Sequence, residues 1–299
     1  MGSRMSGARA VVIGDVIDDI IVVPIGPVRP DTDTTARISR HEGGSAANTA
    51  AWMASRGAPV DFVGCVGVGD RERHGAVLRD LGVTPHLSEH PSLATGTIVI
   101  VVDGEQRTML TDRGANAGLS ADAVTDALLA DAAVLHLTGY SLVDAFSAAV
   151  LGALIDRAHA HDVLVTLDPG SAGFIADYGV AAFRAALRGI DLLLPNLAEG
   201  RLLAGTDDQT ALIGSLLEIA PAVVLTDGAG TVVVGRRGEP TIEVPVTAVE
   251  AVDPTGAGDA FTAGLLTALL AGDNLVDAAR AGVLVASQAV TRPGARPPR

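Results

Sequence analysis

The sequence contains no lysine: all 21 residues in its combined lysine and arginine count are arginine. This absence excludes a phosphate-binding loop with a Walker-A lysine, a lysine Schiff base and the ATP-binding lysine of protein kinases. If the protein binds a phosphate group, it must therefore use arginine side chains, backbone N–H groups or a metal ion.

Cysteine and long apolar runs are also scarce or missing. The single cysteine, Cys65, cannot form a disulfide within the chain, which favours a reducing compartment and predicts a cytoplasmic protein. No apolar run reaches the roughly eighteen residues that a membrane-spanning helix needs. The net charge of −14 argues against nucleic acid or an anionic membrane as a partner, because both would require a cationic surface.

The hydrophobic pattern predicts an α/β fold. Short runs rich in β-branched residues alternate with alanine-rich stretches of helical period. The expected strands are 10–13, 60–65, 133–137, 163–167, 190–194 and 222–226, and the expected helices are 45–56, 71–81, 121–129, 143–159 and 208–219. This alternation is typical of a mostly parallel sheet with helices on both faces, a three-layer αβα sandwich. We expect a single domain over residues 8–299.

Two segments break this alternation and predict a small separate β-layer. Residues 20–40 are rich in proline, aspartate and threonine and have no helical period, while 95–102 and 107–111 flank a glycine-containing turn and form a predicted hairpin. Extended segments without crossover helices do not fit inside a parallel sheet. We expect a lid from about 18–41 and 93–116; the alternative is that these are edge strands of the main sheet. Residues 231–246 should extend the main sheet in antiparallel fashion.

A glycine-rich loop, Thr255-Gly256-Ala257-Gly258-Asp259, opens a helical pattern at 260–271. The first N–H groups of a helix have no partner within it and carry the positive end of its dipole, so this loop is a candidate anion site that needs no lysine. A carboxylate in the first turn would repel a bound phosphate. Asp259 either satisfies the helix dipole or acts as a base that takes a proton from an attacking hydroxyl.

Four segments, in order along the chain, resemble the motifs of the ribokinase-like (PfkB) carbohydrate kinases. They are His-Glu-Gly-Gly-Ser-Ala-Ala-Asn-Thr-Ala at 41–50, Asn-Leu-Ala-Glu at 196–199, Thr-Asp-Gly-Ala-Gly at 226–230 and Asp-Pro-Thr-Gly-Ala-Gly-Asp-Ala-Phe at 253–261. The resemblance extends from Val11 to Gly294. It implies a ribokinase-like sandwich with an inserted β-sheet lid, and ATP-dependent phosphorylation of a primary hydroxyl on a sugar or sugar acid.

The resemblance also implies roles for the residues that bind and transfer the phosphoryl group. Asp259 would be the general base, and the N–H groups of Gly256, Ala257, Gly258 and Asp259 would form the anion hole. The remaining residues would serve ATP and Mg²⁺: Asn196 and Glu199 would place the metal and the phosphates, Glu199 indirectly, and Thr226, Gly228 and Gly230 would form the nucleotide-contacting turn.

On the acceptor side, Gly43, Gly44 and Asn48 match the residues that hold sugar hydroxyls in such kinases. Asp19 best matches the acidic residue that binds the sugar, and Asp15 is a second candidate. Ile17 stands where ribokinases have a substrate-binding asparagine, which argues against ribose itself. Arg113 follows the predicted hairpin, and it would either bind a carboxylate or phosphate on the substrate or be a surface arginine.

The resemblance further suggests a K⁺ site and a homodimer. The residues that match the family's monovalent-cation site are Asp253, Thr255, Ala289, Arg292 and Gly294, although Pro298 stands where ribokinase has a serine ligand. Lids of this kind often pair edge to edge, so we expect a dimer through the lid. Two alternatives remain: a nucleoside kinase of the same fold, and a non-catalytic sugar-binding or regulatory protein that keeps the fold.

Overall fold

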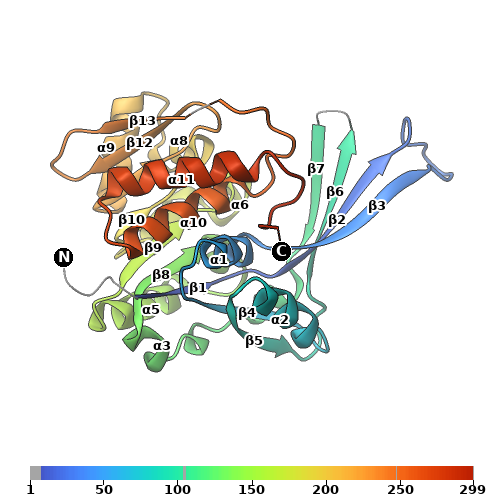
Figure 1. Cartoon of the computed structure of the whole chain (residues 1–299), viewed down its shortest axis with the longest axis horizontal. Helices are drawn as coiled ribbons and strands as arrows, with labels where there is room; N and C mark the ends of the chain where they lie inside the picture. Colours follow the sequence, from blue (N-terminus) through green and yellow to red (C-terminus); the bar gives the residue numbers. More distant parts are fainter. Residues whose placement is uncertain (1–7, 104–105, 247, 299) are drawn as a thin grey trace.

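The computed structural model describes residues 8–103, 106–246 and 248–298 (Figure 1). Its main sheet has the strand order β13-β12-β11-β10-β9-β8-β1-β4-β5. The strands are β1 (Arg9–Ile13), β4 (Val60–Gly67), β5 (Thr84–His90), β8 (Ala132–Thr138), β9 (Leu164–Asp168), β10 (Leu192–Leu193), β11 (Ala222–Leu225), β12 (Thr231–Arg236) and β13 (Ile242–Pro245). From β11 to β5 all neighbours are parallel, and β12 and β13 continue the sheet antiparallel, as predicted.

Helices cover both faces of this sheet, which makes three layers. One buried cluster lies against α1 (Ser45–Ser55), α10 (Ala257–Leu270) and α11 (Leu275–Ala289). A second cluster, on the other face, includes side chains of α5 (Ala148–Ala160), α7 (Val180–Ala186), α8 (Leu197–Ala204) and α9 (Gln209–Ile219). Strand β4 is buried along its whole length, as expected for a strand with helices on both sides.

The lid is a separate four-stranded sheet, which confirms the predicted second β-layer. Its order is β3-β2-β6-β7, and its strands are β2 (Ile17–Pro24), β3 (Ala36–Gly43), β6 (Gly96–Asp103) and β7 (Gln106–Asp112). The lid projects from one side of the main domain (Figure 1). The alternative of edge strands in the main sheet is wrong, because the four strands pair only with one another in the described part of the chain.

Two predicted helices, 121–129 and 143–159, are wrong as continuous elements. In their place stand η2 (Ala121–Ala123) and α3 (Asp126–Ala130), then α4 (Tyr140–Asp144) and α5. A hydroxyl side chain starts the second helix of each pair: Thr125 accepts a hydrogen bond from Leu128 N–H, and Ser147 accepts one from Val150 N–H. These caps outweigh the continuous helical hydrophobic pattern. The sequence analysis missed β5, α6 (Ala172–Tyr178), α7, α8 and α11, whereas α2 (Arg71–Asp80) matches a predicted helix.

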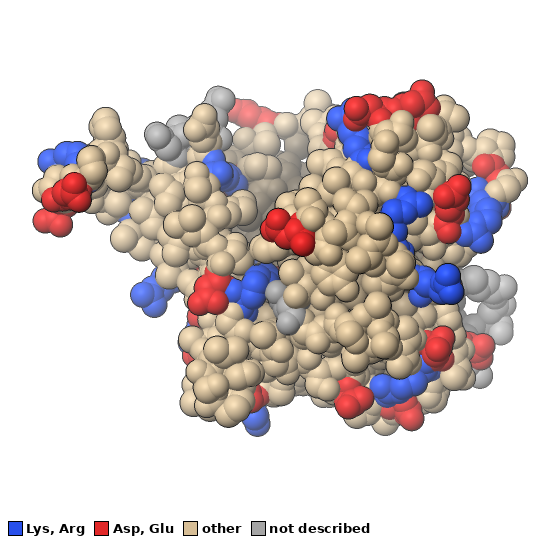
Figure 2. Space-filling view, turned by 180° about the vertical axis from the view of Figure 1, so that it is seen from behind, with Lys and Arg blue, Asp and Glu red and all other residues tan. Residues whose placement is uncertain are grey.

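The surface agrees with the composition. No helix among the described residues is long and apolar enough to cross a membrane. Figure 2 shows arginine and acidic side chains interspersed over the face opposite to that of Figure 1, without a broad basic patch on the described part of that face.

Helices α10 and α11 pack closely through two glycines. A Cβ on Gly264 would lie 2.7 Å from Val285 Cγ2, and a Cβ on Gly282 would lie 2.8 Å from the carbonyl oxygen of Phe261. Because backbone cannot move aside as a flexible side chain can, the helices approach this closely only where the Cβ is missing. The contact matters for the site, because α10 carries the glycine-rich loop at its beginning.

We expect Gly282→Ala to lower the free energy of unfolding by about 1–3 kcal/mol, because the added methyl group pushes α10 away from α11. Urea denaturation measures this change. Gly214→Ala is the matched control: Gly214 lies within α9 with nothing near its Cβ position, so alanine should be neutral or stabilise by about 0.5–1 kcal/mol. Equal effects of the two substitutions would contradict the packing argument.

Candidate active site

The predicted site residues meet at the carboxyl edge of the main sheet. Five parallel strands end there, and the residues that follow or end them line one cavity: Asp15 after β1, Tyr140 after β8, Asp168 in β9, Asn196 after β10 and Thr226 after β11. The lid contributes Asp19, Ile98, Ile100 and Met109. The cavity volume of about 280 Å³ suits a small molecule rather than a polymer.

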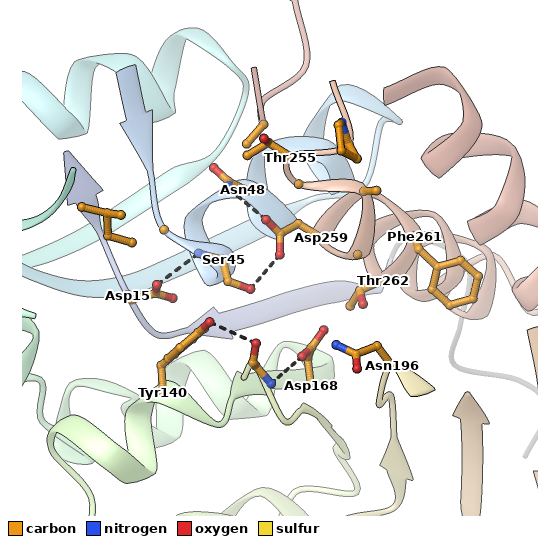
Figure 3. A pocket seen from close by; sticks show the side chains of 18 of the residues that line it. Asp15, Ser45, Asn48, Tyr140, Asp168, Asn196, Thr255, Asp259, Phe261 and Thr262 are labelled. Carbon is orange, nitrogen blue, oxygen red and sulfur yellow. Dashed lines mark hydrogen bonds between the residues drawn. The ribbon is translucent and has the colours of Figure 1, made fainter. Parts of the chain in front are cut away.

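Asp259 lies at the centre of this cavity, in the first turn of α10 (Figure 3). One carboxylate oxygen accepts a hydrogen bond from Ser45 Oγ at 2.7 Å, and the other accepts one from Asn48 Nδ2 at 2.9 Å. Burial raises the pKa of Asp259 to about 6, although these two hydrogen bonds oppose the rise. The carboxyl group is therefore ionised at neutral pH and basic enough to accept a proton.

The glycine loop presents its backbone to the same cavity. Gly256, Ala257 and Gly258 line it together with Asp259. Gly256 has φ 75°, a left-handed conformation that a glycine adopts at low cost, and a Cβ there would lie 2.8 Å from Ala295. The start of α10, which carries the positive end of the helix dipole, thus lies at the wall of the cavity beside the carboxylate.

Asp15 caps helix α1 from the end of β1. Its two carboxylate oxygens accept hydrogen bonds from the N–H groups of Ser45, at 3.1 Å, and Ala46, at 3.0 Å. Gly44 has φ 99°, and a Cβ there would lie 2.4 Å from the carbonyl oxygen of Asp15. Asp15 therefore fixes the start of α1, and with it the positions of Ser45 and Asn48.

Asp19 and Gly43 form a second matched pair. Asp19 projects from β2 and lines the cavity. A Cβ on Gly43 would lie 2.1 Å from Asp19 Oδ2, so only glycine leaves room for this carboxylate. Burial raises the pKa of Asp19 to about 7; Arg296 opposes the rise, whereas Asp15 and Asp259 add to it.

Arg113 is not a surface arginine. Its side chain is 14% exposed and lines the cavity, with Nη1 3.6 Å from Asp15 Oδ2. Its guanidinium carbon lies 4.5 Å from the centre of the Tyr140 ring, a cation–π distance. The arginine is thus held in the cavity by one acidic and one aromatic partner.

Glu199, which is buried, and Asp168, which is half-buried, form an acidic pair in the lining of the cavity. Glu199 completes a capping box at the start of α8: it accepts hydrogen bonds from the backbone N–H and the Nδ2 of Asn196, and Asn196 Oδ1 accepts one from Glu199 N–H. Burial raises the pKa of Glu199 to about 7. Burial, and then repulsion by Glu199, raise the pKa of Asp168 well above its usual range.

Asp168 was missed in the sequence analysis. The signal was present, because Asp168 directly follows the predicted strand 163–167 and the ends of parallel strands meet at one edge of a sheet. Its Oδ1 accepts a hydrogen bond from Gly170 N–H at 2.8 Å, and Tyr140 donates to the carbonyl oxygen of Gly170 (Figure 3). The turn after β9 therefore holds the carboxylate toward Asn196.

The predicted nucleotide turn is only partly in the cavity. Thr226 lines it and forms an isolated parallel bridge with Asn196. Gly228 and Gly230 lie on the exposed turn that follows, outside the cavity lining. The roles of these two glycines stay predictions.

The two halves of the predicted monovalent-cation site lie side by side. Asp253 Oδ2 accepts a hydrogen bond from Gly294 N–H at 3.0 Å, and the carbonyl oxygen of Val290, next to Ala289, accepts one from Asp253 N–H at 3.1 Å. The sequence analysis missed Arg107, on lid strand β7, which contacts the first of these halves. Its guanidinium lies 3.1 Å from Asp253 Oδ1 and donates to Thr255 Oγ1. The lid thus reaches the start of the glycine loop.

Comparison with known proteins agrees with this geometry. A family model described as pfkB family carbohydrate kinase matches residues 8–299. The chain belongs to this family. Over 291 residues it is 30% identical to a ribokinase of Haemophilus influenzae, a match that covers 93% of this chain and 90% of that protein. It is also 29% identical to the bifunctional protein HldE of Caulobacter vibrioides, but there it spans only 61% of the relative.

Solved structures confirm the ribokinase-like fold with its small second sheet. An adenosine kinase from Sinorhizobium meliloti superposes with a TM-score of 0.87 at 24% identity, covering 98% of this chain and 96% of that one. A putative ribokinase II from E. coli, in complex with ATP and Mg²⁺, has a TM-score of 0.83 at 24% identity, with coverages of 96% and 94%. At these identities the likeness shows the fold alone. As a PfkB kinase, the chain is a phosphotransferase, and PfkB kinases use ATP with Mg²⁺.

We expect Asp168→Asn to raise the melting temperature at pH 8 by about 1–4 °C, because it removes one of two carboxylates that repel each other. Since the folded state raises the pKa of Asp168, its ionised form destabilises the fold, and the gain should shrink toward pH 5 as the wild-type side chain binds a proton. Differential scanning fluorimetry measures both effects. Asp131→Asn, at an exposed position, is the control; a lower melting temperature for Asp168→Asn at pH 8 would contradict the repulsion.

Proposed function

We propose that this kinase transfers the γ-phosphoryl group of ATP to a primary hydroxyl of a sugar or sugar acid, with Asp259 as the general base. The observation that carries the proposal is the position of this carboxylate. It faces the cavity beside the first N–H groups of α10, and hydrogen bonds from α1 hold both of its oxygens. One group can thus take a proton at the place where the adjacent backbone can bind a phosphate.

Phosphoryl transfer at this site needs few protein groups. The acceptor hydroxyl gives its proton to Asp259, and its oxygen forms a bond to the γ-phosphorus. The bond between that phosphorus and the bridging oxygen breaks, and ADP leaves. The N–H groups of residues 256–259 stabilise the charge on the transferring oxygens. A lid over the cavity excludes water, which would otherwise compete as acceptor.

The acidic pair opposite Asp259 suits a divalent cation. Asp168 and Glu199 repel each other, so a positive ion near them would relieve that repulsion. Their carboxylate oxygens and the amide oxygen of Asn196 are the kind of ligand that Mg²⁺ prefers. When bound with ATP, Mg²⁺ would neutralise charge on the phosphates. We propose that Glu199 acts on it indirectly, because hydrogen bonds from Asn196 already occupy both of its oxygens.

The acceptor site favours a polyol. Asp19 and Asn48 place a carboxylate and an amide near Asp259, which are groups that bind sugar hydroxyls. Arg113 adds a cation for a sugar acid, although Asp15 already offsets part of its charge. One observation favours a nucleoside as a second candidate: the lid covers the cavity with Ile98, Ile100 and Met109, an apolar surface against which a base could pack.

We expect Asp259→Asn to lower kcat by about 10²–10⁴-fold, because the amide cannot accept the proton. In the wild-type enzyme the rate should fall about tenfold per pH unit below pH 6, since the pKa of Asp259 is about 6 and only its ionised form is a base. ADP release measures both. Asp131→Asn again serves as the exposed control, and wild-type turnover by Asp259→Asn would show that the base is another residue.

A panel of acceptors separates the remaining candidates. ADP release is measured with D-ribose, D-fructose, 2-keto-3-deoxygluconate and adenosine at equal concentrations. We expect a sugar or sugar acid to give the highest kcat/KM; a preference for adenosine would establish the nucleoside candidate instead. Tight sugar binding by calorimetry without turnover would favour a non-catalytic sugar-binding or regulatory protein.

We also propose a K⁺ ion between the two segments that Asp253 joins. Its ligands would be the Asp253 carboxylate and main-chain oxygens among Thr255, Ala289, Arg292 and Gly294. The hydrogen bond from Gly294 N–H to Asp253 supports this, because it holds the two segments together. Turnover in KCl is compared with turnover in tetramethylammonium chloride, and equal rates would overturn the site.

K⁺ and ATP are both abundant in the cytoplasm, where we propose that the enzyme works.

A homodimer through the lid is the assembly that we propose. Strands β3 and β7 are the two edges of the lid sheet. Ile38 on β3 and Leu110 on β7 are exposed large apolar side chains, which a partner could cover. We expect a dimer in light scattering that dissociates on Leu110→Glu; a monomeric wild-type enzyme would contradict this assembly.

A further inference from the structure

The C-terminal tail, residues 291–298, folds back beside the glycine loop and α1. Trp52 Nε1, on α1, donates a hydrogen bond to the carbonyl oxygen of Ala295 at 2.9 Å. Ala295 also packs against Gly256, where a Cβ would be only 2.8 Å away. In Figure 1 the tail ends next to α1, at the base of the lid. These contacts place the next residue, Arg296, behind the wall of the cavity.

Arg296 makes two directed contacts with the segment 43–48. Its Nε donates a hydrogen bond to Asn48 Oδ1 at 3.1 Å, and its Nη2 donates one to the carbonyl oxygen of Gly43 at 2.8 Å. One guanidinium therefore bridges the end of β3 and the first turns of α1. Both contacted residues belong to the motif that resembles the sugar-binding segment of the family.

The contact with Asn48 fixes which way its amide points. An asparagine amide has one acceptor oxygen and one donor nitrogen, whereas a guanidinium can only donate. The oxygen must therefore face Arg296, which turns Nδ2 toward Asp259 Oδ2 at 2.9 Å. The opposite orientation would set the amide oxygen against the carboxylate and the amide N–H₂ against the guanidinium, and both contacts would be repulsive.

We infer that Arg296 is a positioning residue for phosphoryl transfer. By bridging Asn48 and Gly43, it holds the acceptor segment 43–48 in place and keeps the amide N–H₂ of Asn48 directed at the Asp259 carboxylate. This inference rests on the proposed role of Asp259 as base. Arg296 acts through Asn48 and is not itself a catalytic residue. The role comes from the tail, a part of the chain outside the four motifs that the family resemblance identifies.

The charge of Arg296 has a separate effect. It lowers the pKa values of Asp259 and Asp19, against the rise that burial causes. The titratable groups that also face Asp259 come from four elements: Asp15 after β1, Asp19 on β2, Asp168 on β9 and Tyr140 on α4. Because Asp15, Asp19 and Asp168 are acidic, removing the guanidinium should raise the pKa of the base.

Three variants separate the geometric effect from the effect of charge. Arg296→Gln removes the charge and both hydrogen bonds. Arg296→Lys keeps the charge but cannot make both hydrogen bonds at once. The control is Arg280→Gln, at an exposed position of α11 where Arg280 pairs with Asp277. We measure kcat, KM and the pH profile with the panel acceptor of highest kcat/KM. Emission of Trp52, the only tryptophan, reports whether the tail stays docked.

We expect Arg296→Gln to lower kcat by about 10–100-fold and to move the acidic limb of the kcat profile to higher pH, with unchanged Trp52 emission. Arg296→Lys should restore the acidic limb but not the full kcat. A wild-type kcat and pH profile in Arg296→Gln would overturn the inference, as would a loss of kcat accompanied by shifted Trp52 emission, because the role would then be structural. If Asp259→Asn is inactive while Arg296→Gln matches wild type, only this inference fails; if Asp259→Asn is active, the proposed base fails.

Discussion

Two hydrogen bonds from helix α1 to the carboxylate of Asp259 join the parts of the molecule on which the site depends. Helix α1 is fixed by Asp15, which caps it from the end of β1, and α10 is fixed by its close packing on α11. Each helix is therefore held in place by contacts that do not involve the other helix. The position of the carboxylate follows from the packing of the two helices rather than from a flexible side chain finding its partner.

The charge distribution in the cavity disfavours a polyphosphate without a counter-ion. Five carboxylates line it, those of Asp15, Asp19, Asp168, Glu199 and Asp259, and burial raises the pKa of the last four. A polyphosphate would add further negative charge. Without lysine, the chain opposes that charge with helix N-termini and arginines, so a divalent cation beside the acidic pair is the simplest means of balancing it.

The sequence predicted what depends on local pattern. The alternation of strands and helices predicted the sandwich, and segments without a helical period predicted the second sheet. The ordered motifs pointed to Asp259, Asn48 and Glu199, which line one cavity. It missed contacts between residues that are far apart in the sequence. Arg107 on the lid contacts Asp253 of the main domain, and Arg296 contacts Asn48, 248 residues earlier in the chain. Such long side chains carry no local signal, because an arginine in a polar segment has the same pattern whether it faces solvent or a buried carbonyl group.

The contact between Trp52 and Ala295 also bears on the order in which the protein can mature. A ribosome synthesises the tail after every other described part of the site, because residues 291–298 follow all of them in the chain. Until the tail docks, the indole N–H of Trp52 lacks the carbonyl that it meets in the folded protein, and the side of the glycine loop at Gly256 stays uncovered. The wall of the cavity beside Gly256 is thus completed only when the tail docks, after the residues that it covers have been synthesised.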